Sequence, residues 1–489
     1  MLFNSEQYFV FFPIVLLLYH IIPQKVRYIW LLICSYIFYM FWNAKYAVLI
    51  FTSTVITYVC GLLINRFRNN RMRKIILILC LLSNLGILFY FKYIEFAVDA
   101  ICKTFRIIHI DIQVPVFDII LPVGISFYTF QALGYAIDVY RGEIKPERNF
   151  LRYALFVSFF PQLVAGPIER SKNLLTQLSD PKKLSYDDFR EGILLMIWGY
   201  FLKIVIADRA ALFIDTVYGN YTKYNGWYII IATFLFAFQI YCDFYGYSVI
   251  AMGSAKMLGI KLMENFDSPY LARSVSEFWR RWHISLTSWF KDYLYIPLGG
   301  NRKGKIRKYI NILIVFLVSG LWHGANFSFI IWGGANGLFQ IIGELLKPVR
   351  DKTVKIFQVN KNLFSYKLFS LIVTFILVDF TWIFFRASGT KVAIKIISEM
   401  KPWNPWILFD GSLYNAGLDS KNFCLLIISL LILLFADICK YKGVILRRWI
   451  LSEGLVFRCV LIAVSIWLVM IFGIWGPAYD AASFIYFQF

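Results

Sequence analysis

Long apolar stretches separated by short basic runs dominate this chain of 489 residues. A helix needs about 20 apolar residues to cross roughly 30 Å of hydrocarbon. Runs of about ten residues with alternating polarity, which a membrane β-barrel needs, are missing from the pattern. We therefore expect an all-α polytopic membrane protein with about 11 to 13 membrane segments. The candidate segments lie near 7–23, 28–43, 46–64, 74–91, 117–139, 190–207, 227–250, 308–322, 326–346, 366–385, 421–438 and 455–476.

Basic clusters orient the early segments. Lys25 and Arg27 follow the first segment, a cluster at 66–74 follows the third, and one at 141–152 follows the fifth. Because cytoplasmic loops are enriched in Lys and Arg, simple alternation predicts that the N-terminus lies outside. The first 24 residues show neither a basic start nor a small-residue cleavage site, so we expect a retained segment rather than a signal peptide.

Two stretches break the simple alternation. The run 153–168 is short and contains Pro161, Gly166 and Pro167. Irregular backbone is tolerated at membrane depth where protein or a water-filled cavity receives its polar groups, so this run predicts a re-entrant element lining a cavity. The second stretch, 264–308, carries aromatic residues at helical spacing between charged ones, which predicts an amphipathic helix at the membrane boundary. Its aromatic and apolar positions are Phe278, Trp282, Trp289, Tyr293 and Ile296.

Composition agrees with a membrane protein. Apolar residues make up 60% of the chain and charged residues 16%, against roughly 45–50% and 25% in globular proteins. This excludes a disordered chain and argues against a water-soluble one. The net charge of +21 lies in runs between apolar stretches, which indicates membrane topology rather than nucleic-acid binding. The eight cysteines form no CxxC pair, so we expect neither disulfides nor a metal site.

Candidate chemistry centres on the four histidines, because imidazole is the natural general base near neutral pH. His20 ends the first segment and His109 lies in an expected loop, and both are interpreted as interfacial polar residues. His323 follows an apolar run and stands in SGLWHGANFSFIIWGGANG. An ionisable side chain near membrane depth is a functional candidate. A buried histidine bonded to a carbonyl between packed helices is the alternative.

Other polar residues supply weaker candidates. His283 lies beside Arg280, Arg281 and Trp282, a group that suits either a phosphate-bearing donor such as a pantetheine thioester or an interfacial belt of solvated cations. Asp243 lies inside an apolar segment and needs a cationic partner, either near 203–209 or at the Arg280 and Arg281 pair. It is carried as a supporting polar group.

Asn326, close to His323, is a further supporting group, with packing or capping as the alternative. The motifs GxSxG, HExxH, GxxxxGK[ST] and GxGxxG are all missing from the chain. This removes the usual signatures of serine hydrolases, zinc proteases, P-loop enzymes and dinucleotide-binding enzymes. Direct group transfer assisted by a histidine base, without metal or redox cofactor, then fits best.

Three motif blocks carry a family resemblance. QIYCDFYGYSVIAMGSAKMLGI (239–260), ENFDSPYLARSVSEFWRRWHISLTSWFKDYLYIPLGGN (264–301) and LWHGANFSFIIWGGANG (321–337) resemble the membrane-bound O-acyltransferases (MBOAT). The similarity is to the bacterial branch that contains the alginate O-acetylation membrane protein and the teichoic acid D-alanyl transfer protein, which FFPQLVAGPIERSKNLLTQL (159–178) also matches. The resemblance covers about 115–345 and implies a catalytic core there with a central tunnel. With no internal repeat evident, we expect one integral membrane domain over 1–489, in which 1–114 and 346–489 are flanking transmembrane helices.

The resemblance also implies a mechanism. His323 matches the invariant histidine of the family, within the tunnel, and His283 matches its second motif histidine on the cytoplasmic donor side. A thioester such as acetyl-CoA or an acyl carrier would be the co-substrate. The acceptor would be a hydroxyl of an exported polysaccharide or of a periplasmic or membrane-anchored SGNH-type partner, at the bacterial inner membrane. The chain has no GDS-type block of its own.

Several points stay open in the sequence. The acceptor, the acyl group, the donor, the C-terminal topology and the oligomeric state are not determined. A transporter or flippase using His323 as a proton relay is the main alternative, although the paired discontinuous helices typical of such proteins are not evident. A scaffold subunit, in which both histidines are dispensable, is the third hypothesis.

Overall fold

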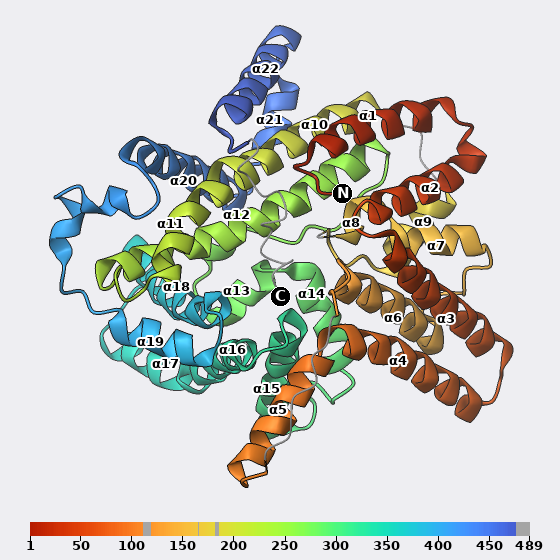
Figure 1. Cartoon of the computed structure of the whole chain (residues 1–489), viewed down its shortest axis with the longest axis horizontal. Coiled ribbons are helices and arrows are strands. Elements are labelled where there is room, and N and C mark those ends of the chain that lie inside the picture. Colours follow the sequence, from red (N-terminus) through yellow and green to blue (C-terminus); the bar gives the residue numbers. More distant parts are fainter. Residues whose placement is uncertain (111–118, 165, 181–184, 476–489) are drawn as a thin grey trace. The chain divides into compact units, whose positions relative to one another are not determined.

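The protein is described by a computed structural model covering residues 1–110, 119–164, 166–180 and 185–475. Within these ranges the regular elements are all helical, as the apolar pattern predicted, and they are drawn in Figure 1. The start of the predicted segment 117–139 lies outside the described residues. The chain divides into two compact units, Met1–Met196 with Ile250–Met263, and Ile197–Val249 with Glu264–Phe489. The prediction of one integral domain over 1–489, with a core at 115–345, stays a prediction.

The first unit contains the N-terminal helices. Within it α3 packs against α4, α6 and α7, and α2 packs against α7. Its helices are α1 (Glu6–Ile21), α2 (Arg27–Met40), α3 (Ala47–Arg66), α4 (Asn70–Lys92), α5 (Ile94–Ile107), α6 (Ile125–Arg141), α7 (Phe150–Ser158), α8 (Phe160–Leu163), α9 (Ser171–Ser179) and most of α10 (Tyr186–Tyr200), with short 3₁₀ turns at Gln24–Val26 and Ala44–Tyr46.

The second unit carries both motif histidines. Its helices are α11 (Asp208–Gly219), most of α12 (Trp227–Met257), α13 (Val275–Arg281), α14 (Ile284–Phe290), α15 (Gly304–His323), α16 (Phe327–Leu345), α17 (Lys347–Ile356), α18 (Phe364–Arg386), α19 (Thr390–Glu399), α20 (Ser420–Tyr441), α21 (Leu446–Ser452) and α22 (Leu455–Phe472). The π-helical turns η3 (Phe201–Ala207) and η5 (Lys291–Tyr295) follow α10 and α14, and 3₁₀ turns lie at Pro269–Leu271, Pro405–Leu408 and Ser412–Asn415.

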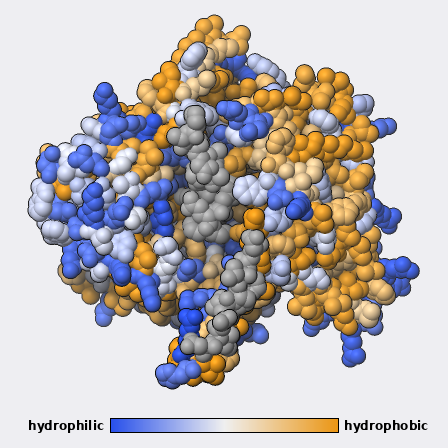
Figure 2. All heavy atoms as spheres, in the orientation of Figure 1, coloured by the Kyte–Doolittle hydropathy of each residue, from blue (hydrophilic) through white to orange (hydrophobic). Residues whose placement is uncertain are grey.

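Seven helices in the described part of the chain are long and apolar enough to cross a membrane, or eight if the bent pair α16 and α17 is one span. The predicted 11 to 13 segments include shorter pieces, such as α1 and the 14-residue α2, which this criterion omits. Large areas of the surface in Figure 2 are apolar, and exposed apolar side chains run along α22. Such a surface is stable only in a lipid environment, so the chain is a multi-pass membrane protein.

The predicted re-entrant run forms two short buried helices, α7 and α8, which are interrupted at Phe159. Side chains receive the backbone groups at this break. Gln162 and Gln131 both donate to the carbonyl of Phe156, at 3.0 and 2.5 Å, and the Ser35 hydroxyl accepts from the amide of Phe160 at 3.1 Å. Irregular backbone in an apolar setting requires this compensation. The re-entrant path itself stays a prediction.

The prediction of one amphipathic helix over the aromatic positions from Phe278 to Ile296 was wrong. The stretch forms α13 and α14, which are separated at Trp282 and His283, and then the π-turn η5. Of the five predicted positions, Phe278, Trp282 and Trp289 are buried, whereas Tyr293 is half-buried and Ile296 is exposed. Helical spacing cannot distinguish an aromatic face that meets headgroups from one that meets other helices.

Candidate functional site

His323 is the last residue of α15, directly before the turn into α16. The two helices pack closely, because a Cβ atom added to Gly320 would collide with the carbonyl of Phe329 and one added to Gly333 with the carbonyl of Phe316. His323 itself is only 3% exposed. The glycines that surround His323 in the sequence therefore bring the backbones of the two helices together beside the imidazole.

Aromatic rings enclose the His323 imidazole. Its ring centroid lies 4.9 Å from Trp322, 5.0 Å from Trp332 and 5.5 Å from Phe385, each in an edge-to-face arrangement. Edge-to-face contacts of this kind fix the orientation of a ring. The central tunnel implied by the family resemblance stays a prediction, since a buried ring does not by itself define a passage.

Two asparagines organise the elements around His323. Asn326 is the N-cap of α16, and its side chain accepts a hydrogen bond from the amide of Ser328 at 3.0 Å. Asn336 is fully buried and joins three helices. It accepts from the indole of Trp279 at 3.2 Å and donates to the Thr381 hydroxyl at 3.1 Å. Asn326 thus has the capping role that the sequence left open, whereas its role as a substrate contact stays a prediction.

His283 lies in the break between α13 and α14, and its backbone adopts the left-handed conformation with φ of 45°. Histidine is among the few residues other than glycine that are enriched in this region, and the contacts around the break keep it there. The imidazole is 1% exposed and lies edge-to-face against Phe244, with centroids 4.7 Å apart. Burial lowers the pKa of His283 to about 3, so its imidazole is neutral near pH 7.

The structure brings the two histidines together. Their ring centroids are 6.4 Å apart, and Trp322 lies 6.0 Å from His283 as well as against His323. They are separated by 40 positions in the sequence and belong to different motif blocks. Two buried imidazoles at this distance are close enough for both to contact one small bound group, whereas their part in a reaction stays a prediction.

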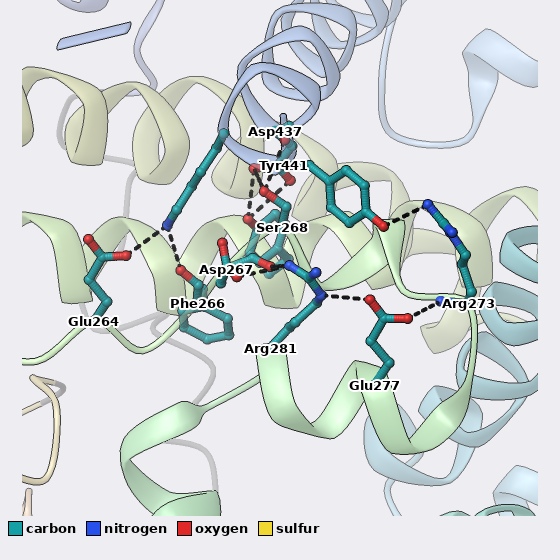
Figure 3. Close-up of polar contacts among 11 residues, drawn as sticks. Glu264, Phe266, Asp267, Ser268, Arg273, Glu277, Arg281, Asp437 and Tyr441 are labelled. Atoms are coloured by element: carbon teal, nitrogen blue, oxygen red, sulfur yellow. Dashed lines mark hydrogen bonds and ion pairs between the residues drawn. The ribbon is translucent and has the colours of Figure 1, made fainter. Parts of the chain in front are cut away.

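The residues beside His283 have different environments. Arg280 is exposed, whereas Trp282 is buried and stacks on Phe278 with ring centroids 5.3 Å apart. Arg281 forms ion pairs with Asp267 at 2.8 Å and Glu277 at 3.1 Å, which are drawn in Figure 3. Arg280 therefore faces solvent, whereas Arg281 is held in a partly exposed ion-pair network. Donor binding by Arg280, Arg281 and Trp282 stays a prediction.

Asp243 has the cationic partner that its burial requires. The Lys203 ammonium lies 2.6 Å from the Asp243 carboxylate and 2.8 Å from that of Asp208. All three side chains are buried, and Lys203 belongs to the π-turn η3. The prediction of a partner near 203–209 is confirmed, whereas the alternative pairing with Arg280 or Arg281 is wrong. A role for Asp243 in substrate binding stays a prediction.

Sequence reasoning did not single out Asn265. This residue is buried, and its backbone carbonyl accepts from the amide of Ile284, directly after His283, at 2.9 Å. Its side chain accepts from the Ser285 hydroxyl at 2.6 Å and donates to that of Ser248 at 3.1 Å. Its only sequence signal is its place in the block ENFDSPY. A neutral amide without charge or periodicity is not conspicuous in a sequence.

Within the described ranges, no three His, Cys, Asp or Glu side chains gather in a way that could hold a metal ion. All eight cysteines belong to those ranges and are free thiols. The expectation of a reaction without metal or redox cofactor stays a prediction.

Comparison with known proteins adds independent information. The model of the membrane-bound O-acyltransferase family matches residues 143–378, a range that includes both histidines. A probable alginate O-acetylase, AlgI, of Pseudomonas syringae is 37% identical over 89% of this chain and 81% of its own length. The chain belongs to the membrane-bound O-acyltransferase family.

Two further relatives show the range of the family. A peptidoglycan O-acetyltransferase of Helicobacter pylori is 34% identical over 82% of this chain and 80% of its own length. A teichoic acid D-alanyltransferase of Bacillus subtilis is 27% identical over 45% of this chain and 58% of its own length. The family match confirms the resemblance identified from the motif blocks. As an MBOAT protein the chain is an acyltransferase.

Proposed function

We propose that this protein is an O-acetyltransferase in the bacterial inner membrane. It moves an acetyl group from a cytoplasmic thioester, such as acetyl-CoA or an acyl carrier, to a hydroxyl outside the cytoplasm. The acceptor is an exported polysaccharide or cell-wall polymer, or an SGNH-type partner that completes the transfer. The names of the relatives from Pseudomonas syringae and Helicobacter pylori support acetyl transfer and an acceptor of this class.

The observation that carries the proposal is the pairing of His283 and His323, 6.4 Å apart in a buried aromatic setting. The His323 imidazole accepts the proton of the attacking hydroxyl while the hydroxyl oxygen bonds to the thioester carbonyl carbon. The carbon–sulfur bond then breaks, and the thiolate takes the proton from the imidazolium. The proton passes from the hydroxyl to His323 and then to the thiolate, and the broken carbon–sulfur bond is replaced by the new carbon–oxygen bond, so the step uses no cofactor. General-base assistance typically contributes a rate factor of about 10² to 10⁴.

His283 has a supporting part in this proposal. Its neutral imidazole lies beside His323 and faces Phe244, so it can orient the thioester or relay a proton without introducing a charge into the apolar site. Arg280, which is exposed, can attract a phosphate-bearing donor. Arg281, Trp282, Asn326 and Asp243 act by holding the surrounding elements.

The test is mass spectrometry of the cell envelope and secreted polymers from cells expressing the wild type or His323→Ala. The wild type is expected to add acetyl groups, and the variant is expected to add none at equal membrane expression. Wild-type acetylation by His323→Ala would refute the assignment. Substrate movement without any covalent change would instead favour the transporter hypothesis.

A further inference from the structure

The last turn of α20 contacts the loop that precedes α13, although the two are far apart in the sequence. We define the motif loop as residues 264–274. The Lys440 ammonium donates to the Glu264 carboxylate at 2.9 Å and to the backbone carbonyl of Phe266 at 2.8 Å. The two acceptors, Glu264 and Phe266, are labelled in Figure 3 with the neighbouring polar residues. The end of α20 thus contacts both a side chain and a main-chain carbonyl of the motif loop.

Other residues of the same helix end reinforce this attachment. The Ser268 hydroxyl donates to the backbone carbonyl of Asp437 at 3.0 Å, and the Tyr241 hydroxyl donates to the Asp437 carboxylate at 3.1 Å. The Arg273 guanidinium donates to the Tyr441 hydroxyl at 2.9 Å. Ser268 adopts the left-handed conformation, with φ of 47°. A residue in this conformation persists where its surroundings determine it.

The motif loop in turn holds the residues on both sides of His283. The amide of Asp267 donates to the carbonyl of Arg281 at 3.0 Å, and the amide of Ile284 donates to the carbonyl of Asn265 at 2.9 Å. Phe266, which Lys440 binds, lies between the two loop residues that make these bonds. A shift of the Phe266 carbonyl would therefore be passed to His283 through both bonds.

The Phe266 side chain makes a second connection. Its ring lies edge-to-face against Trp282, with centroids 5.0 Å apart, and against Phe244 at 5.1 Å. Phe244 is the ring that contacts the His283 imidazole. The residue held by Lys440 therefore reaches His283 through the backbone and through the aromatic packing.

We propose that Lys440 is a positioning residue for His283 in acyl transfer, acting through the Phe266 carbonyl. This inference rests on the proposed function, in which His283 lies at the reacting centre. Lys440 lies beyond residue 378, where the match to the family model ends. Part of the positioning apparatus for the motif histidine thus comes from a C-terminal helix outside the matched range.

The test compares Lys440→Met with a matched control, Lys442→Met. Lys442 is an exposed lysine two residues further along the chain, so its loss removes the same charge without affecting the motif loop. Transfer is measured in inverted membrane vesicles with radiolabelled acetyl-CoA, and rates are normalised to folded protein from fluorescence-detected size exclusion. A displacement of about 1 Å at a reacting group can cost about 100-fold in rate. We expect Lys440→Met to lower kcat by roughly 10- to 100-fold, with the KM for acetyl-CoA within about twofold of the wild type.

Two further variants separate positioning from charge pairing and from stability. Glu264→Gln removes the ion pair but keeps the bond to Phe266, so its kcat is expected within about threefold of the wild type. Lys440→Arg retains charged donors and is expected to recover most of the activity lost in Lys440→Met. If Lys440→Met fails to fold, Lys440→Ala, which also lacks a donor and is smaller, replaces it in the comparison.

The outcomes distinguish this inference from the proposed function. If Lys440→Met matches Lys442→Met in an active background, or if its whole effect lies in the amount of folded protein, Lys440 is not a positioning residue. A loss in Glu264→Gln equal to that in Lys440→Met would also overturn the inference. If His323→Ala is as active as the wild type, the proposed function fails instead.

Discussion

The Lys203 ammonium lies 2.6 Å from the Asp243 carboxylate, and both side chains are buried. The same ammonium lies 2.8 Å from Asp208, so one lysine compensates two acidic groups. Taking charges out of water costs several kcal/mol per ion, and removing one partner leaves the others uncompensated. Lys203 therefore connects the π-turn η3, α11 and α12. Loss of its ammonium is expected to destabilise the folded state.

We predict that Lys203→Met destabilises the protein by about 3–5 kcal/mol, because it removes the ammonium with which two buried carboxylates form ion pairs. The measurement is tryptophan-fluorescence unfolding in detergent. Lys361→Met is the control, since the pair of Lys361 with Asp351 is largely exposed and such pairs contribute about 1 kcal/mol or less. Equal effects of the two substitutions would contradict the importance of burial.

The conformation of His283 leads to a second prediction. Asparagine adopts the left-handed region more readily than most residues, so His283→Asn should keep the fold and lose the imidazole. We expect an unfolding temperature close to that of the wild type and at least tenfold slower acyl transfer. His283→Val should lose the same activity and also about 1–3 kcal/mol of stability from backbone strain. Substantial activity in His283→Asn would remove His283 from the reacting centre.

Gly320 and Gly343 form a matched pair on the packed helices α15 and α16. An added Cβ on Gly320 would collide with the Phe329 carbonyl, whereas one on Gly343 would meet nothing within 4 Å. Gly320→Ala should therefore separate the helices, destabilise the protein by about 1–3 kcal/mol and reduce activity, because His323 is three residues away. Gly343→Ala should be neutral or stabilise by up to about 1 kcal/mol through helix propensity. Acetyl transfer and thermal unfolding of both variants test this contrast, which a tolerant Gly320→Ala would refute.

Glu169 gives a prediction about pH. Burial raises its pKa to about 7, although hydrogen bonds from the Met263 amide and the Asn173 side chain offset part of this effect. An unfolded glutamate has a pKa of about 4.3, so the folded state binds the proton more tightly. The contribution of Glu169 to stability is thus complete below about pH 4 and falls as the pH rises towards 7.

Glu169→Gln stays neutral and lacks this dependence. We expect the unfolding temperature of Glu169→Gln, relative to the wild type, to rise between pH 5 and pH 7 and to level off above pH 7. Thermal unfolding in a series of buffers measures the difference. If the unfolding temperatures of the two proteins change with pH in parallel, burial does not raise the pKa of Glu169.

The sequence by itself determined the class of the protein. Hydropathy indicated a helical membrane protein because only helices of about 20 apolar residues satisfy their backbone groups in hydrocarbon. The rarity of histidine in apolar segments singled out His323, and the motif blocks identified the family. The need of a buried Asp243 for a cation predicted its partner near 203–209, where Lys203 lies. The first and last of these conclusions follow from local composition or from the cost of burying a charge, whereas the family follows from the resemblance of the motif blocks.

Only the tertiary structure decided how the site is held. The break at His283, its 6.4 Å approach to His323, and the engagement of Arg281 with Asp267 and Glu277 depend on contacts between distant segments. Helical periodicity predicted an unbroken helix there, because periodicity reports which residues are apolar and not what covers them. The bond from Lys440 to the Phe266 carbonyl has no sequence signature, since a backbone carbonyl is the same at every position. Long-range hydrogen bonds to the main chain become visible only when the chain is folded.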